Sequence, residues 1–352
     1  MNQIFANRLR SARLLNGFSL QDLADKIDNK ISRQAIFKYE SGSVVPNSEM
    51  INILADALNV RPDYFSRGTA VEIGQIEFRK QSNFSSKEQK KVVEQTREYL
   101  SRYLELEMIL NLESLFQNPL KDIGVILSKD QIDNASEQLR EKWELGMDSI
   151  CNVAELLEEN GIKIISVHAD GQFDGLQTLV NDKVPVIAYN SKISNKPDRI
   201  RFTLLHELGH LLLSFPDDLS ASQIEKLCHQ FAASMLLPKK ALVQELGIKR
   251  NKISIQELGY IKKEYGISIQ AIVMRALDCE IIDSGFVGKF FNYLNMMNWK
   301  IDEPISYDGV EKSKRFDQLL YRALSEEQVS TSKAAALKNM KLADFRFEFM
   351  AI

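Results

Sequence analysis

The chain has 352 residues, of which 44% are hydrophobic and 26% are charged, with a formal net charge of −3. This length predicts two or three domains, and the near-neutral balance gives no whole-chain argument for binding to nucleic acid or a bilayer. There is no run of 18 apolar residues, no signal-peptide core and no disulfide framework among the three cysteines, so we expect a reduced, cytoplasmic protein with no membrane partner.

Residues 1–67 have the pattern of a small helical domain. Two serines, Ser19 and Ser32, each stand at a capping position before a short amphipathic run, and a turn containing Asp28 and Asn29 separates the two runs. The expected helices cover residues 4–15, 19–27, 32–40, 48–58 and 62–65. Two short helices across a tight turn, embedded among three others, form a five-helix helix-turn-helix domain.

The motifs S-L-Q-D-L-A, from Ser19, and I-S-R-Q-A-I-F-K-Y-E-S-G, from Ile31, resemble the Cro/CI-type (XRE) helix-turn-helix family. The turn between them is a residue or two longer than is common in that family. The resemblance implies binding to double-stranded operator DNA. Because residues 1–67 hold nine Lys and Arg against seven Asp and Glu, one copy would bind weakly, and a homodimer on a two-fold operator is expected.

Base contacts are expected from the start of the second short helix, which would enter the major groove. Arg33 suits guanine and Gln34 suits adenine, while Phe37 would touch a thymine methyl group or pack on its own domain. The expected DNA-binding residues are Gln21, Ser32, Arg33, Gln34, Phe37 and Lys38. Further candidates for phosphate contacts are Ser19, Arg10 and Arg13. For each of these residues, a solvated surface side chain is the alternative.

Residues 68–135 are expected to form a helical connector. Gly68-Thr69 has the character of a linker, residues 71–80 could form a short strand, and a serine-capped helix of about 25 residues begins near Ser85. An apolar stripe runs along this helix from Val92 to Leu106. The helix would space the DNA-binding domain from the catalytic one, pair with its copy in a dimer, or pack on its own peptidase domain.

The stretch Leu204–Leu213 contains the pattern H-E-x-x-H, in His206, Glu207 and His210. Positions i and i+4 of a helix share one face, so the two imidazoles can meet one metal ion, and Glu207 can take a proton from a water molecule whose pKa zinc lowers to about 7. The chain has only four histidines, so a chance match is expected on the order of a few times per thousand chains. The alternative is a buried amphipathic helix with two satisfied histidines.

A catalytic zinc site needs a third protein ligand, and the helical pattern that ends at Pro238 offers one. Glu225 is the first acidic residue of this pattern, and its apolar neighbours would turn that face toward the active-site helix. His229, one turn later, is the rival ligand. Cys228 is a third possibility, although a cysteine in such a pattern is more often a small buried apolar residue.

The motifs R-F-T-L-L-H-E-L-G-H-L-L-L and E-K-L-C-H-Q-F-A-A-S-M-L-L-P resemble the ImmA/IrrE family of zinc metallopeptidases over residues 136–280. The family's His-His-Glu ligand set implies that His206, His210 and Glu225 bind Zn²⁺, with Glu207 as the catalytic base. The family usually carries Asn at the position of His229, which leaves a supplementary or substitute ligand role for this histidine open. The resemblance also implies a repressor-type protein substrate.

Around this motif we expect a helix over residues 138–160, strands over 162–167, 173–180 and 185–189, and an active-site helix that starts near Pro197. The strand 185–189 would hold an extended peptide substrate by β-addition. Four side chains have both a functional and a plain interpretation. His168 and Tyr189 would stabilise an oxyanion or lie outside the chemistry, and Arg199 and Arg201 would anchor a substrate carboxylate or be solvated.

The C-terminal residues 281–352 are expected to form an accessory or sensor module, with a short capped helix over Ser330–Leu337. The overall fold class is mainly α, of the α+β type, with domains 1–67, 68–135, 136–280 and 281–352. The leading interpretation is a transcriptional regulator whose endopeptidase domain cleaves a repressor-type protein or the chain itself. The alternatives are a non-proteolytic, antitoxin-like repressor that senses a ligand or binds a toxin, and a peptidase whose N-terminal domain docks on repressor protein.

Overall fold

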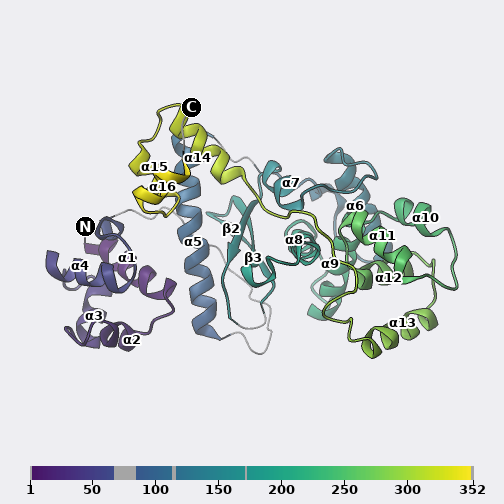
Figure 1. Ribbon diagram of the computed structural model, residues 1–352, viewed down its shortest axis with the longest axis horizontal. Helices are drawn as coiled ribbons and strands as arrows, with labels where there is room; N and C mark the ends of the chain where they lie inside the picture. The colour runs from purple at the N-terminus through teal and green to yellow at the C-terminus, as the bar shows by residue number, and fades with distance from the viewer. Residues whose placement is uncertain (1, 67–84, 113–115, 171–172, 350–352) are drawn as a thin grey trace. The chain divides into compact units, whose positions relative to one another are not determined.

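The computed structural model describes residues 2–66, 85–112, 116–170 and 173–349, and Figure 1 labels its helices and strands. The expected linker at Gly68-Thr69 and the expected strand at 71–80 lie outside the described residues. The chain forms two compact units: unit 1 comprises residues 1–113, 167–173 and 316–352, and unit 2 comprises residues 114–166 and 174–315. The described part is mainly helical with one small sheet, as the sequence predicts.

The N-terminal part of unit 1 is the expected helix-turn-helix domain. Its elements are α1 (Asn2–Leu15), α2 (Leu20–Lys26), α3 (Arg33–Glu40), α4 (Ser48–Ala57) and a 3-10 helix, η1 (Pro62–Ser66). Ser19 and Asp22 cap α2 reciprocally, each side chain accepting the backbone N–H of the other, and the Ser32 hydroxyl caps α3. Asp28 and Asn29 adopt left-handed backbone angles, which lets the chain reverse between the two helices.

The long helix α5 (Ser86–Ile109) is confirmed, and it packs inside unit 1. Its Tyr103 and Leu106 are fully buried in one apolar cluster with the C-terminal helices, and Arg102 donates a hydrogen bond to the Leu337 carbonyl oxygen at 3.0 Å. Those helices are α14 (Arg315–Ser325), α15 (Thr331–Leu337) and α16 (Leu342–Glu348). The capped helix expected at 330–337 is therefore confirmed as α15.

Unit 2 departs from the sequence prediction at its first helices. The elements are η2 (Lys121–Ile123), α6 (Lys129–Lys142) and α7 (Val153–Glu159), so the single helix expected over 138–160 is wrong. Glu144 and Gly146 take positive φ angles of 55° and 54°, which ends α6, and the Asn152 side chain caps a new helix. The apolar spacing continues through this turn, which is why the periodicity suggested one helix.

The sheet consists of β1 (Lys163–Val167), β2 (Gly175–Val180) and β3 (Val184–Asn190), in the order β1-β3-β2. β2 and β3 form an antiparallel hairpin in which Gly175 pairs with Tyr189, and its turn places Asn181 and Asp182 at positive φ. β3 is therefore the central strand with both edges paired. The expectation that residues 185–189 add a substrate strand is wrong, because a central strand has no free edge.

The remaining elements of unit 2 follow β3 along the chain. They are η3 (Ser191–Ile193), α8 (Pro197–Leu212), α9 (Ala221–Leu236), α10 (Lys239–Leu246), α11 (Ile255–Tyr265), α12 (Ile269–Asp278) and α13 (Ser284–Met296). The helix α8 packs on β2 and β3 with one face and on α9 with another. None of the helices in the described ranges is long and apolar enough to cross a membrane.

Candidate metal centre and nucleic-acid interface

The H-E-x-x-H motif lies on α8, which begins with Pro197 at its first turn and buries Leu204, Leu205 and Leu208 in the core. A close crossing with α9 occurs at Gly209. A Cβ atom added there would lie 3.2 Å from the Phe231 ring and 3.4 Å from Cys228. Glycine therefore lets the two helices approach closely enough for α9 to reach the histidine face of α8.

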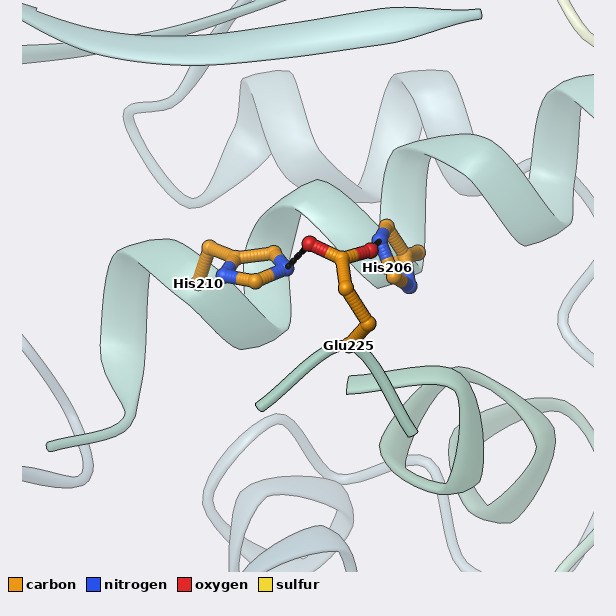
Figure 2. Close-up of side chains that lie close together, drawn as sticks. All are labelled: His206, His210 and Glu225. Atoms are coloured by element: carbon orange, nitrogen blue, oxygen red, sulfur yellow. Dashed lines mark ion pairs between the residues drawn. The ribbon is translucent and has the colours of Figure 1, made fainter. Parts of the chain in front are cut away.

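Three side chains from these two helices converge on one point. Nε2 of His206 lies 3.4 Å from one carboxylate oxygen of Glu225, and Nε2 of His210 lies 3.7 Å from the other. Figure 2 shows the carboxylate pointing between the two imidazoles. Among the described residues, this is the group of potential ligands whose donor atoms all lie within 4.8 Å of one another.

The donor set and the spacing of the cluster fit a divalent metal ion. Two imidazoles and one carboxylate are the ligands of a catalytic zinc site, and tetrahedral bonds of about 2.0–2.2 Å place neighbouring ligand atoms roughly 3.3–3.6 Å apart. The 3.4 Å separation between His206 and Glu225 lies within this range, and the 3.7 Å separation between His210 and Glu225 lies just beyond it. A fourth position is left for water or substrate by three such ligands.

The two rival ligands occupy different positions. Cys228 is fully buried at the crossing with Gly209 and is not part of the cluster, so it has the packing role that was its alternative. His229 is exposed, with its ring 4.3 Å from the ring of His206 and its Nδ1 2.7 Å from the Glu225 carbonyl oxygen. That contact makes Nδ1–H the donor and leaves the lone pair on Nε2.

Glu207 follows His206 on α8 and is almost fully buried. The first residue of β2 lies directly on it, since a Cβ atom at Gly175 would be 3.1 Å from Cγ of Glu207 and 2.7 Å from Cγ2 of Thr203. Gly175 is thus needed for close contact between the sheet and α8. In the sequence, Gly175 ends the motif F-D-G, which is part of the resemblance to the ImmA/IrrE family, but its contact with Glu207 could not be predicted from that motif.

The structure agrees with the plain interpretation of one arginine and corrects that of another. Arg199 is exposed, and its Nη2 contacts both carboxylate oxygens of Asp174, at 2.7 and 2.8 Å. Arg201 is fully buried and paired with Glu311, so neither a substrate anchor nor a solvated arginine describes it. Its partner lies 110 residues away in sequence, which no local pattern reveals.

The two oxyanion candidates have plain surroundings. The His168 ring is half-exposed, 3.8 Å from Asp170, and belongs to unit 1, whereas the metal cluster belongs to unit 2. Tyr189 is buried in β3, and burial raises the pKa of its hydroxyl above the ordinary value. The hydroxyl therefore keeps its proton at neutral pH.

The DNA-binding residues expected on α2 and α3 all face solvent: Gln21, Ser32, Arg33, Gln34, Phe37 and Lys38. The Phe37 side chain is 59% exposed, which removes the alternative that it packs on its own domain. Ser32 uses its hydroxyl to cap α3. Arg10 and Ser19 are also exposed.

Arg13 is the exception, and its expected phosphate contact is wrong. Its guanidinium is buried and holds both carboxylate oxygens of Glu40, at 2.6 and 2.7 Å, as well as the Phe18 carbonyl oxygen. This fork ties α1 to the end of α3. Arg13 therefore supports the fold of the domain and is not available to DNA.

Comparisons with known proteins agree with both regions. Residues 9–65 match the family model described as helix-turn-helix, and residues 157–277 match the model described as IrrE N-terminal-like domain. Over 66 residues the chain is 35% identical to the SPbeta prophage-derived uncharacterized HTH-type transcriptional regulator YonR of Bacillus subtilis (strain 168). That alignment covers 19% of this chain and 59% of that protein, less than two thirds of its length.

Proposed function

We propose that this chain, which joins a helix-turn-helix domain to an IrrE N-terminal-like domain, is a DNA-binding transcriptional regulator with a zinc-dependent endopeptidase activity. The observation that carries the proposal is the convergence of His206, His210 and Glu225 beside a buried Glu207. A site that only stabilises the fold has no need of a carboxylate that could act as a base. A relative that is named a transcriptional regulator adds support for the N-terminal part.

In this proposal, His206, His210 and Glu225 hold the zinc ion, which supplies Lewis acidity and a water molecule of lowered pKa. Glu207 accepts the proton of the attacking water and later delivers it to the nitrogen of the leaving amine. Burial of Glu207 beside Gly175 keeps its carboxylate in one place for both transfers. Both proton transfers are thus assigned to one side chain of α8.

The DNA-binding part of the proposal rests on α3. The exposed side chains of Arg33, Gln34 and Phe37 follow one helix whose start would enter the major groove, and a homodimer would match a two-fold operator. The substrate class is a repressor-type protein or a second copy of the chain itself. Its cleavage would release the operator, and the place of action would be the cytoplasm, where that DNA is.

The test is an intact-mass measurement on zinc-loaded protein, alone and with candidate repressors, in parallel with Glu207→Gln. We expect a defined fragment with the wild type and none with the variant, which should still bind zinc. An operator-binding assay on the same samples should show release with the wild type alone. No fragment under any condition, with zinc bound and operator binding intact, would overturn the peptidase part.

The position of His229 supports a second candidate function. Its ring lies 4.3 Å from the ring of His206, outside the group formed by His206, His210 and Glu225, and a change of its rotamer would let Nε2 act as a fourth ligand. A fourth protein ligand closes a zinc site against water and makes it structural. The domain would then sense a ligand or bind a partner such as a toxin, without proteolysis. Replacement of His229 by Asn separates the two: zinc affinity should hardly change for a peptidase and should fall at least tenfold for a four-ligand site.

A further inference from the structure

The back of the active-site helix is fixed by a segment from far along the chain. Arg201 of α8 and Glu311 form an ion pair at 2.7 Å in which both side chains are 0% exposed. Arg201 also donates to the Tyr307 hydroxyl at 3.0 Å, and its guanidinium lies over the Tyr307 ring. Glu311 in turn accepts the backbone N–H of Val153 at 3.0 Å. The guanidinium of Arg201 also donates to backbone carbonyl oxygens of Ile150, Cys151 and Tyr265, but its carboxylate partner is Glu311, which follows α13.

A second tie runs from the first turn of α8 to the same segment. The Lys262 ammonium contacts Asp198 of α8 and Glu303, both at 2.7 Å. The Glu303 carboxylate also accepts the N–H groups of Ile269 and Gln270, at 2.9 and 3.0 Å. The start of α8 and the start of α12 are therefore joined through the Lys262 ammonium of α11 and the Glu303 carboxylate. A third, more exposed contact links Lys196 to Asp302 at 2.7 Å.

Residues 302–311, here called the strap, form neither helix nor strand and are held by close packing as well. A Cβ atom at Gly259 of α11 would lie 2.1 Å from Ile305, and one at Gly266 would lie 2.7 Å from Tyr307. Side chains of the strap thus fill spaces that only glycine leaves open. The strap lies beyond residues 157–277, the part of the chain that matches the IrrE N-terminal-like model.

Arg201 and the two histidines project from opposite sides of α8. At about 100° per residue, Arg201 projects roughly 140° from His206 and roughly 180° from His210 around the helix. The strap therefore holds one side of α8 while the opposite side carries the histidines. Rotation or sliding of α8 would separate Arg201 from Glu311 and leave a buried charge uncompensated, which is strongly unfavourable. The ion pair thus resists the motion that would move His206 and His210 away from Glu225.

We propose that the strap is a positioning element of the metal centre, with Arg201 and Glu311 as its positioning residues. The proposal rests on the proposed function, since it assigns the cluster to a metal ion. By this proposal, the residues that support the metal cluster extend past the matched region 157–277 to Glu311. In sequence only residues 312–314 separate Glu311 from α14, so the chain runs directly from the strap into the C-terminal helices.

The test compares Glu311→Gln with a control that breaks a different buried ion pair of the same unit. Asp133→Asn removes the charge that faces Arg275 of α12, at 2.7 Å, and no residue of α8 takes part in this pair. The Asn oxygen can still accept the Ser234 hydroxyl of α9, as the Asp133 carboxylate does, so the control leaves the helix of Glu225 tied. Two quantities are measured on the full-length protein: the zinc dissociation constant, by competition with a chelating dye, and amide hydrogen exchange of α8 without metal. Both variants should lower the melting temperature.

We expect Glu311→Gln to raise the zinc dissociation constant by 10- to 100-fold, of the order known for residues that orient metal ligands, and to accelerate exchange along α8. Asp133→Asn should change the zinc constant by less than about threefold. If Glu311→Gln does not fold, Tyr307→Leu replaces it, because this variant leaves both buried charges paired. Its zinc constant should rise several-fold.

Wild-type zinc affinity and wild-type α8 exchange in the strap variant would overturn the proposal. An equal loss of zinc affinity in Asp133→Asn at an equal drop in melting temperature would also overturn it, since general destabilisation would then suffice. Failure of the wild type itself to bind zinc would overturn the proposed function instead. The exchange measurement on the metal-free protein would still decide the role of the strap in that case.

Discussion

The proposed metal centre and the proposed DNA-binding face are both carried by helices, but their side chains are held in opposite ways. Around the metal centre, ligands from α8 and α9 are held within 4.8 Å of one another by the glycine crossing and the packing of the core. On α3, the expected contact residues are exposed to solvent, and little of their surface packs against the rest of the domain. We therefore expect all-or-none effects from changes at the first site and graded effects from changes at the second.

The largest effect is expected when one metal ligand is removed. His206→Ala leaves two ligands where a catalytic site needs three, so zinc should be lost at the concentrations that saturate the wild type. The measurement is the zinc content of the purified protein after dialysis. His168→Ala is the matched control, because His168 lies outside the cluster and should leave the content unchanged. Full zinc content in His206→Ala would show that the cluster is not the metal site.

A smaller but still large effect is expected at Gly175. An added methyl group would meet Thr203 at 2.7 Å and Glu207 at 3.1 Å, so Gly175→Ala should lower the free energy of unfolding by about 1–3 kcal/mol and reduce cleavage. Gly288→Ala on α13 is the control, since nothing lies within 4 Å of its added Cβ atom and helix propensity should make it neutral or stabilising. Denaturant unfolding of both variants measures the contrast. Equal stability of the two would contradict the tight contact of β2 with α8.

Graded effects are expected on the DNA-binding face. Arg33→Ala should weaken specific operator binding by about 1–3 kcal/mol and relax the preference for one base pair. Lys38→Ala should weaken binding to all sequences and reduce the slope of the salt dependence by about one unit. Both are measured by titration of labelled operator at several salt concentrations. An Arg33 variant with wild-type specificity would mean that α3 does not read the bases.

Arg13→Ala serves to separate fold from contact in the same domain. Because Arg13 is forked to Glu40 inside the domain, we expect a lower melting temperature and, below that temperature, an unchanged salt dependence of DNA binding. A reduced salt slope with wild-type stability would contradict the structure at this residue. Thermal unfolding and the same titrations provide both readouts.

The smallest effect is expected outside both sites, at the start of α11. The Ser254 N–H, and then Arg250, hold the pKa of Glu257 at about 2. A depressed pKa stabilises the fold above the ordinary value near 4.5, and this contribution disappears as the pH falls toward 2. Glu257→Gln should therefore cost a few tenths of a kcal/mol at pH 7 and nothing near pH 2, because the pair is exposed. A difference that grows as the pH falls would contradict the assignment.

The cluster of His206, His210 and Glu225 could be predicted because its signals are local. The spacing of His206 and His210 fixes one helical face, and the resemblance supplied Glu225 at a helical position that the structure brings to the same point. The starts of α2, α3, α5 and α15 could be predicted from serine caps for the same reason, because a capping side chain accepts the N–H of a residue only three positions later.

The parts that escaped prediction depend on partners distant in sequence. An arginine near a helix start, such as Arg201, is expected at the surface. Arg201 is buried because its charge is paired with Glu311, which lies 110 residues later in the sequence. The order of the strands is equally non-local, which is why β3 was expected at an edge. The break between α6 and α7 depends on the positive φ of Glu144, and glutamate rarely adopts this conformation, so its presence in the sequence does not predict the break.

The packing of α5 in unit 1 also has a consequence for biosynthesis. Tyr103 and Leu106 are covered by helices that follow Arg315, and the bond from Arg102 to Leu337 spans 235 residues. At the translation rates of cells, about 5–20 residues per second, a ribosome needs roughly 10–50 s to make that stretch. During this interval Tyr103 and Leu106 of the nascent chain are not yet covered by α14, α15 and α16. We therefore expect these apolar side chains to stay exposed, or to be bound by a chaperone, until those helices are made.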